Sequence, residues 1–323
     1  MPRSLIAMAK KILYILISFA FWGFLSVSPS SANSSPEKFL VICAHPDDEV
    51  FIRSTLARLI ENGNEVHAIY LTAGEGGTDR HWKDTPEYDL STKEQAEHQA
   101  SLRKTRTLET AKASYVYGFT NHLILNVRDE PLRDPVTHIP VRDPEPFLKP
   151  GGPWDVNWIR KQISDSLTSY KPDVVLTFFP GQPTTHAHHQ ATAKIVEQMR
   201  EDGLFGKQLK TALGFYESDV IIHHETLHYP LSKSRVEISP LWISDHPGPH
   251  LGVAYGKIGT EGALQHDSQL KGDTETLIRQ WDKNPAEILA PLTSKDSLNP
   301  LLTALHGGKS VQVWKNDQLV ISY

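Results

Sequence analysis

The chain has 323 residues, enough for one large α/β domain or two ordinary domains with a sizeable core. Its 33 Lys and Arg residues face 38 Asp and Glu residues, a formal net charge of -5. This balance provides no general positive potential, so neither nucleic acid nor an anionic lipid surface is an expected partner. The 16 histidines are numerous enough that a lone histidine does not indicate a site. The only cysteine, Cys43, lies in an apolar segment, which excludes an intramolecular disulfide and predicts a small core residue.

The first 32 residues have the pattern of a secretory signal peptide. Three basic residues precede an apolar run and a small-residue cleavage site: Arg3, Lys10 and Lys11, then residues 12–27, then Ser30-Ser31-Ala32. The alternative is an uncleaved membrane anchor, although the run is shorter than the roughly 20 residues of a spanning helix. We therefore expect a protein that is exported to the periplasm or secreted, with residues 1–32 removed and no stable membrane span left.

The region after the signal begins with a strand, a helix and a second strand. Residues 39–43 are continuously apolar, as in a strand buried on both faces of a parallel sheet. Apolar residues at helical spacing follow over 50–60 and stop at Asn62-Gly63, and residues 65–71 read as the next strand. This order predicts a right-handed parallel crossover.

The next segments continue the alternation. The glycine-rich turn 72–77 leads to a helix over 93–113 and a strand over 123–127. Residues 128–154 are rich in proline and aspartate, which is typical of a lid or binding loop. A helix over 156–167 and a buried strand over 174–179 follow.

The remaining third has mixed signals. We expect strands over 212–216 and 236–243, a helix over 260–270 and a terminal hairpin that turns at 315–317. The sequence thus predicts an α/β, Rossmann-like fold, with a mostly parallel sheet flanked by helices and a mixed C-terminal extension. One domain would span 38–323, with its Rossmann-like core at 38–205 and the mixed part at 206–323.

Two motifs rich in metal-binding side chains follow two of these strands. His45-Pro46-Asp47-Asp48 comes directly after the strand at 39–43, and His186-Ala187-His188-His189 follows the strand at 174–179. The carboxyl ends of parallel strands meet at one edge of the sheet, where ligands bind. We therefore expect both motifs to reach a common crevice.

The spacing within the two motifs favours a catalytic metal site. With Thr184 or Thr185 as helix N-cap, His186 and His189 would share a face at i, i+3, so that one binds a metal while the other faces substrate. Of the adjacent Asp47 and Asp48, one can coordinate while the other meets water. Three His and Asp ligands with a fourth position open are typical of catalytic zinc. Read alone, the acidic triplet could simply cap a helix and the histidines could be solvated; their coincidence at equivalent strand ends favours the metal site.

An ordered series of motifs resembles the PIG-L/LmbE-like family of zinc-dependent N-deacetylases. The series covers residues 39–270 and consists of AHPDDE after the first strand, LTAGEGG after the second, Arg106 and Glu109 in a helix, Asp129, an HxxH after a later strand, and Lys257 with Ala263-Leu264, His266 and Ser268-Gln269. The resemblance implies Zn²⁺ held by His45, Asp48 and His189. It implies Asp47 as the general base and His186 as the charged group that stabilises the tetrahedral oxyanion.

The resemblance and the sequence leave several roles open. Arg106 and His266 are candidate substrate-binding residues; the alternatives are an ion pair of Arg106 with Glu109 and a hydrogen-bonded surface position for His266. Two departures from the family pattern stand out: Ile52-Arg53-Ser54 replaces glycines after HPDDE, and His188 stands just before the last ligand, which leaves the choice between His188 and His189 open. Three tryptophans in loop-like stretches could stack on a sugar or anchor their loops: Trp82, Trp154 and Trp242. Glu75 is expected to order the glycine turn.

The function implied by the resemblance is removal of an N-acetyl group from an N-acetylglucosamine-type sugar or glycoconjugate, which gives acetate and a free amine. Hydrolysis of another N-acyl amide is an alternative within the same chemistry. An exported carbohydrate-binding protein without turnover is an alternative of another class.

Overall fold

The structure is a computed structural model. It describes residues 36–82, 91–129, 134, 136–138, 141–178, 186–205, 211–216, 220–224, 234–238, 250–253, 255–270, 311–315 and 318–322. The chain divides into Met1–Pro36 and Glu37–Tyr323, and the expected signal peptide lies outside the described residues. None of the helices in the described ranges combines the length and the apolar character needed to cross a membrane.

The centre of the fold is a nine-stranded sheet with the order β3-β2-β1-β4-β5-β6-β7-β8-β9. Strands β1 to β5 pair in parallel, as do β7 and β8, whereas the β5–β6, β6–β7 and β8–β9 pairs are antiparallel. The strands are β1 Lys38–Cys43, β2 Glu65–Thr72, β3 Asn121–Val127, β4 Val174–Phe178, β5 Thr211–Tyr216, β6 Val220–His224, β7 Ser234–Ile238, β8 Val311–Lys315 and β9 Gln318–Ser322. The expected Rossmann-like α/β fold with a mostly parallel sheet is confirmed.

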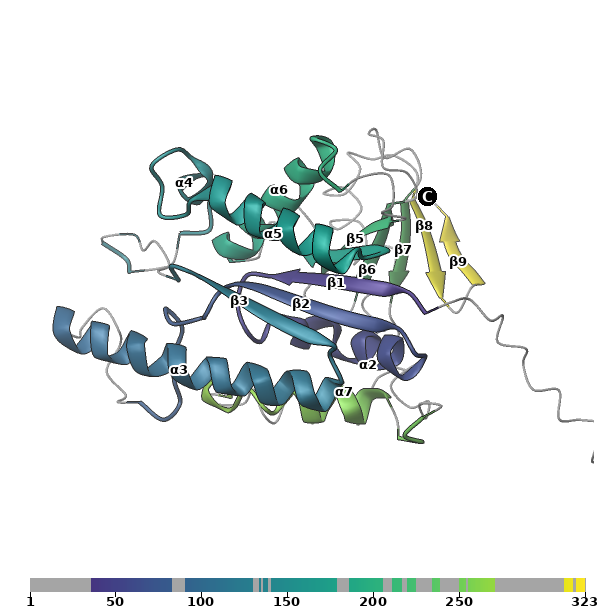
Figure 1. The fold of residues 1–323 in the computed structure, drawn as a ribbon, viewed down its shortest axis with the longest axis horizontal. Helices are drawn as coiled ribbons and strands as arrows, with labels where there is room; N and C mark the ends of the chain where they lie inside the picture. The colour runs from purple at the N-terminus through teal and green to yellow at the C-terminus, as the bar shows by residue number, and fades with distance from the viewer. Residues whose placement is uncertain are drawn as a thin grey trace, which may run out of the picture. The chain divides into compact units, whose positions relative to one another are not determined.

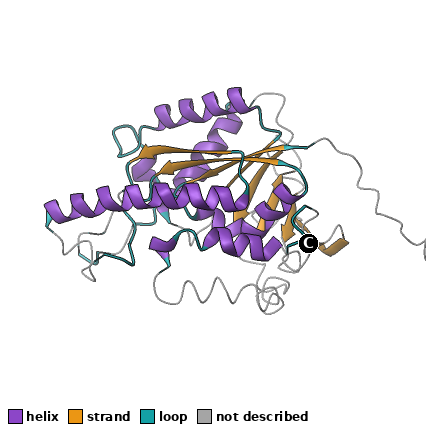
Figure 2. Ribbon diagram, turned by 60° about the horizontal axis from the view of Figure 1, so that its bottom comes forward, coloured by secondary structure: helices purple, strands orange, loops and turns teal. Residues whose placement is uncertain are grey.

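Helices cover both faces of the parallel strands (Figure 1). One layer contains α4 Glu145–Leu148, α5 Val156–Tyr170 and α6 Ala187–Glu201, and the other contains α2 Arg53–Glu61, α3 Thr92–Tyr117 and α7 Tyr255–Ala263. Figure 2 shows the strands between these helices. The helical connections between the parallel strands therefore lie on both faces of the sheet, as in a doubly wound fold.

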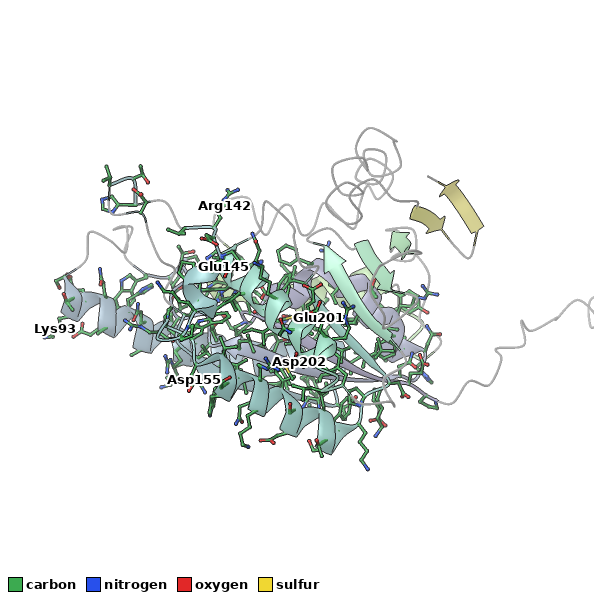
Figure 3. All side chains as sticks on the ribbon, turned by 90° about the horizontal axis from the view of Figure 1, so that it is seen from above. Lys93, Arg142, Glu145, Asp155, Glu201 and Asp202 are labelled. Carbon is green, nitrogen blue, oxygen red and sulfur yellow. The ribbon has the colours of Figure 1, made fainter. Side chains whose placement is uncertain are left out.

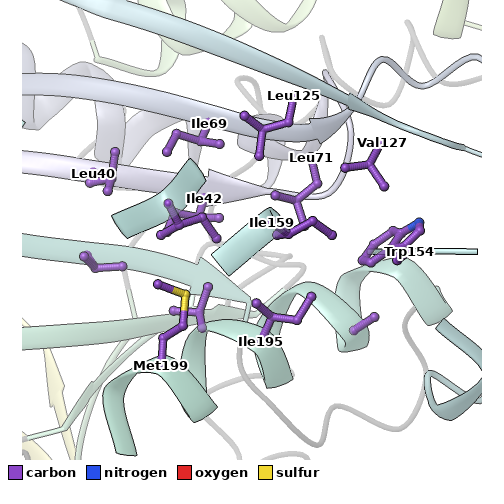
Figure 4. Close-up of a cluster of buried hydrophobic side chains, with 14 of the residues drawn as sticks. Leu40, Ile42, Ile69, Leu71, Leu125, Val127, Trp154, Ile159, Ile195 and Met199 are labelled. Carbon is purple, nitrogen blue, oxygen red and sulfur yellow. The ribbon is translucent and has the colours of Figure 1, made fainter. Parts of the chain in front are cut away.

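The apolar strands are buried on both sides because successive side chains point to opposite faces. Leu40 and Ile42 of β1 pack in one core cluster with Ile159 of α5 and Ile195 of α6 (Figure 4). Val41 and Cys43 pack in the other cluster, with Ile52 and Leu56 beneath them. Cys43 is fully buried, as expected.

Polar residues define where the helices begin and end. Ser91 and Glu94 form a capping box at the start of α3, and Gly118 in the left-handed conformation ends it. The carboxylate of Asp155 accepts a hydrogen bond from Trp158 N at 3.0 Å at the start of α5, and Asp202, at the end of α6, pairs with Arg160 of α5. Asp155 and Asp202 are labelled in Figure 3.

Two expected elements differ from the structure. The helix expected over 260–270 is α7, which ends at Ala263 and is followed by a separate 3-10 turn, Asp267–Gln269. It starts earlier than expected, at Tyr255, and it contains Gly259 and Gly262, which disfavour helix in isolation but allow its close approach to Arg53 and Tyr117. The strand expected over 236–243 runs from Ser234 to Ile238, and residues 239–243 lie outside the described part.

The C-terminal strands extend the same sheet rather than forming one of their own. The terminal hairpin is confirmed as the antiparallel pair β8–β9. The proposed division of the domain at residue 205 stays a prediction.

Candidate metal and catalytic site

The two sequence motifs meet at the point where the strand order reverses. β1 lies between β2 and β4, and the chain leaves β1 and β4 toward helices on opposite faces of the sheet. Such a switch point leaves a crevice outside the carboxyl ends of the strands. His45, Asp47 and Asp48 lie at the end of β1, and His186 and His189 lie at the start of α6.

Three side-chain atoms form a compact triangle there. His189 Nε2 lies 3.0 Å from Asp48 Oδ1 and 3.3 Å from His45 Nδ1, and His45 Nδ1 lies 3.5 Å from Asp48 Oδ1. All three residues are buried. At metal–ligand distances of about 2.0 to 2.2 Å, two ligands at a tetrahedral angle lie about 3.3 to 3.6 Å apart. The triangle therefore has nearly the dimensions of one face of a tetrahedral site, and its donor set of two imidazoles and one carboxylate fits Zn²⁺.

The carboxylate of Asp48 is oriented by the backbone of its own turn. Its Oδ2 accepts hydrogen bonds from Ala44 N at 2.9 Å and His45 N at 2.7 Å, which leaves Oδ1 directed to the triangle. Burial alone would raise the pKa of Asp48, but His189 and His45 hold that pKa well below its ordinary value. An ionised carboxylate between two imidazoles is the charge arrangement that a divalent cation requires.

Asp129 orients His45 from the side opposite the triangle. Its Oδ1 lies 3.3 Å from His45 Nε2, and its Oδ2 accepts a hydrogen bond from Gly76 N at 2.9 Å. Burial alone would lower the pKa of His45, but Asp129 and Asp48 raise it to about 10. A carboxylate on the far nitrogen of a metal-binding histidine fixes its tautomer and ring orientation.

His188 lies on this far side of His45 and not at the triangle. Its Nδ1 lies 2.9 Å from His45 Nε2 and 3.1 Å from Asp129 Oδ1, and its ring is fully buried against Phe147 and Trp154. His45, His186 and His188 form a second group within metal-binding distance, without a carboxylate. The geometry supports His189 for the position that the sequence left open between His188 and His189.

Asp47 stands beside the triangle with its side chain 27% exposed, in contrast to the buried Asp48. Its Oδ2 accepts a hydrogen bond from Arg106 Nη2 at 3.0 Å. Burial raises the pKa of Asp47 and Arg106 opposes that rise. A Cβ on Gly74 would overlap the guanidinium of Arg106, so the glycine turn leaves the space through which Arg106 reaches Asp47.

His186 differs from the expectation in its position in the helix. It is itself the N-cap of α6, where its Nδ1 accepts a hydrogen bond from His188 N at 3.3 Å; Thr184 and Thr185 lie outside the described residues. Burial and the neighbouring histidines lower the pKa of His186 to about 2. The lowered pKa favours the neutral imidazole, and with Nδ1 accepting from His188 N, Nε2 is the nitrogen that can carry the proton.

The structure also excludes the alternatives named for two other residues, Arg106 and His266. Arg106 is buried and pairs with Asp47; Glu109 instead accepts hydrogen bonds from Ser268 N and Ser268 Oγ, both at 2.7 Å. His266 is buried and not on the surface, and its Nε2 lies 2.5 Å from Glu49 Oε1.

The loop tryptophans and Glu75 have structural roles where they are described. Trp154 is buried and donates a hydrogen bond from Nε1 to Arg128 O at 3.0 Å, so it anchors its loop. Trp82 lies 4.9 Å from the ring of His98, and Trp242 lies outside the described residues. Glu75 pairs with Arg103 and accepts a hydrogen bond from Asp129 N, and thus orders the glycine turn.

Sequence reasoning gave no role to two residues that support the site, Asp129 and Glu49. Asp129 follows β3 at the same edge of the sheet as both motifs. The carboxyl ends of parallel strands share one edge, so the argument that placed the two motifs in a common crevice also applies to Asp129. For Glu49 the sequence offers only the alternative of a helix cap for the acidic triplet, and its link to His266 spans 217 residues, which no local pattern can reveal.

A buried His-Asp-His triangle beside a more exposed carboxylate, at the switch point of a parallel sheet, is typical of metal-dependent hydrolases. Residues 40–200 match the sequence profile of PIG-L, described as GlcNAc-PI de-N-acetylase, and the chain belongs to this family. It is a metal-dependent N-deacetylase. No match was found among curated proteins.

Several solved structures are similar to this chain. N,N'-diacetylchitobiose deacetylase from Pyrococcus horikoshii is 18% identical, with 78% of this chain and 79% of that chain covered and a TM-score of 0.47. The zinc-inhibited form of teicoplanin deacetylase Orf2 is 14% identical, with 78% and 93% covered and a TM-score of 0.47. GalB, a 4-carboxy-2-hydroxymuconate hydratase from Pseudomonas putida KT2440, is 13% identical, with 82% and 89% covered and a TM-score of 0.44. These similarities are too weak to carry an inference about this chain.

Proposed function

We propose that the protein is a zinc-dependent hydrolase that removes the acetyl group from an N-acetylglucosamine-type sugar or glycoconjugate and releases acetate and a free amine. The observation that carries the proposal is the triangle of His45, Asp48 and His189 with Asp47 beside it. The sugar class is supported by the description of the family, GlcNAc-PI de-N-acetylase. Hydrolysis of another N-acyl amide would use the same groups.

Each side chain of the site has a separate task in this reaction. When bound, zinc supplies a Lewis acid that polarises the amide carbonyl and lowers the pKa of water. Asp47 takes the proton from the attacking water and passes it to the leaving amine. His186 donates a hydrogen bond from its Nε2–H group to the developing oxyanion, a contact worth on the order of 10²- to 10³-fold in rate. No covalent intermediate is needed.

Acetate release from a panel of N-acetylated sugars, with Zn²⁺ added, tests the proposal. We expect Asp47→Asn to keep stoichiometric metal and to lose about 10²- to 10⁴-fold in kcat, because the base is gone while the triangle is intact. Wild-type turnover in this variant would exclude Asp47 as the base. Absence of acetate release from every sugar in the panel, with sugar binding retained, would instead support the carbohydrate-binding alternative.

The ligand assignment is tested by a matched pair of variants. His189→Gln should release the metal, whereas His188→Gln should retain it, because only His189 lies at the triangle. Elemental analysis of the purified proteins measures both. Metal retained in the first variant and lost in the second would move the assignment to His188.

We further propose that the protein is exported. The proposal is supported by the basic residues, the apolar run and the small-residue site at Ser30-Ser31-Ala32. The intact mass of the protein from its native host should correspond to a chain that begins at Asn33, and an uncleaved N-terminus in the membrane fraction would indicate the anchored alternative.

A further inference from the structure

A buried acid–imidazole pair lies next to the site and takes no part in the chemistry described above. Glu49 Oε1 lies 2.5 Å from His266 Nε2, and the two residues are 0% and 1% exposed. Because His266 is sealed from solvent, it cannot contact a substrate that enters from the crevice. A buried carboxylate and imidazole at this distance stabilise each other's position, since a missing partner would leave a buried polar group unsatisfied.

The second oxygen of Glu49 connects this pair to the backbone of Asp47. Asp47 N donates a hydrogen bond to Glu49 Oε2 at 3.1 Å. Asp47 has φ 111° and ψ -14°, in the left-handed half of conformational space that non-glycine residues avoid. Such a conformation costs on the order of 1–3 kcal/mol and persists only where surrounding contacts hold it. Glu49 is such a contact, because its carboxylate accepts from the amide of the strained residue.

His266 is in turn placed by the C-terminal segment. α7 packs closely against α2 and α3, and Ser268, two residues after His266, is held by the carboxylate of Glu109. This segment lies beyond residues 40–200, the part of the chain that matches the family profile. The turn that carries Asp47 is therefore supported, through Glu49, by His266, a residue more than 200 positions away in the sequence.

We propose that Glu49 and His266 are a positioning pair that holds Asp47 in its strained backbone conformation, and thereby places the carboxylate of Asp47 for proton transfer. The proposal rests on the proposed function, in which Asp47 is the base. His266 acts through Glu49, and Glu49 acts on the amide of Asp47. Without His266, Glu49 loses the hydrogen bond to its Oε1 and shifts, and the turn at Asp47 relaxes.

The test compares His266→Phe, which fills the space without a donor, with His266→Gln, whose amide can still donate to Glu49. Glu61→Gln is a matched control, because Glu61 is a buried acid of α2 that accepts hydrogen bonds from His250 N at 3.1 Å and Leu251 N at 2.9 Å, away from the site. The measurements are kcat, KM, metal content and the hydrogen-exchange rate of the Asp47 amide by NMR.

We expect His266→Phe to lower kcat on the order of 10²-fold with KM and metal content nearly unchanged, since a misplaced reacting group has an effect of this size. The Asp47 amide should exchange faster in this variant, and His266→Gln should restore both properties. If His266→Phe does not fold, Glu49→Gln takes its place in the same comparison. A folded variant with wild-type kcat, or an equal loss of kcat in Glu61→Gln, would overturn the proposal.

The amide measurement separates this proposal from the proposed function. If the wild type releases no acetate but the Asp47 amide exchanges faster in His266→Phe than in His266→Gln and Glu61→Gln, the proposed function fails and the positioning pair stands. If the exchange rate of the Asp47 amide is the same in all of these proteins, the positioning pair fails.

Discussion

Asp47 combines a reactive side chain with a backbone conformation that ordinary residues avoid. Its amide is held by Glu49 and its carboxylate by Arg106. These two contacts come from different elements, the turn after β1 and helix α3. A base that is held from both ends can be placed within a few tenths of an ångström, which proton transfer requires.

The first prediction at the residue scale concerns the space beside Arg106. Gly74→Ala places a Cβ where the guanidinium passes, so Arg106 must leave Asp47, and we expect kcat to fall about 10²-fold with metal content unchanged. Gly63→Ala is the control, because Gly63 also has a positive φ but no atom lies within 4 Å of its Cβ position. Both variants carry backbone strain, so equal activity losses in the two would show that the passage of Arg106 is not the cause.

The second residue-scale prediction concerns Asp129. Asp129→Asn weakens the contact that orients His45, and we expect the metal Kd to rise about 10- to 100-fold, the usual effect of losing such a partner. Competition with a chelator of known affinity measures the Kd. Asp134→Asn, in the loop that follows, changes a carboxylate whose partners among the described residues are the nearby Val136 and Thr137, and it should leave the Kd unchanged. An unchanged Kd in Asp129→Asn would mean that His45 is oriented by its other contacts alone.

At the scale of elements, α7 is the helix whose packing position the sequence does not predict. Its glycines face neighbouring elements: a Cβ on Gly262 would lie 2.5 Å from Cζ of Tyr117 in α3, and a Cβ on Gly259 would lie 3.0 Å from the backbone of Arg53 in α2. Tyr117 also donates a hydrogen bond to Gly259 O at 3.2 Å. The glycines allow an approach that any larger residue would prevent, and this approach brings His266 to Glu49.

The prediction for α7 is a coupling between Gly262 and Tyr117. Gly262→Ala should destabilise the protein despite the better helix propensity of alanine, which by itself would contribute about 1 kcal/mol, because the methyl group overlaps the tyrosine ring. In Tyr117→Ala the ring is absent, and adding Gly262→Ala to this variant should be neutral or stabilising. Chemical denaturation of the four proteins gives the coupling free energy. Additive effects would show that α7 does not need this close contact.

At the scale of the whole molecule, the sequence predicts the layers and the common edge better than it predicts long-range partners. The strand at 39–43 and the turn at 45–48 were predictable because an uninterrupted apolar run is followed directly by charged residues. The meeting of His45 with His189 followed from a general property of parallel sheets. The lowered pKa of His186 was not predictable, because it depends on the burial of the ring and on the packing of neighbouring histidines. The Glu49–His266 contact was not predictable either, because it depends on how two distant elements pack.

The same architecture makes the stability of the protein depend on its metal. His45 and Asp48 follow β1 while His189 belongs to α6, so a bound cation joins two elements that are separated by about 140 positions of sequence. Without the cation, the ionised Asp48 and the adjacent Asp47 repel each other at the end of one strand. At a free metal concentration 100 times the Kd, we expect stabilisation by about 2.7 kcal/mol, which corresponds to roughly 4 °C in Tm for a chain of this size.

Thermal denaturation with saturating Zn²⁺ and with excess chelator measures this difference. In Asp48→Asn the two conditions should give nearly the same Tm, because the carboxylate of the triangle is lost, whereas Asp47→Asn should keep most of the difference. A wild-type Tm that does not respond to the chelator, in protein shown to release its metal, would separate metal binding from folding and contradict the role of the triangle as a link between β1 and α6. An equal response in Asp48→Asn and the wild type would instead place the metal at the other histidine group, His45, His186 and His188.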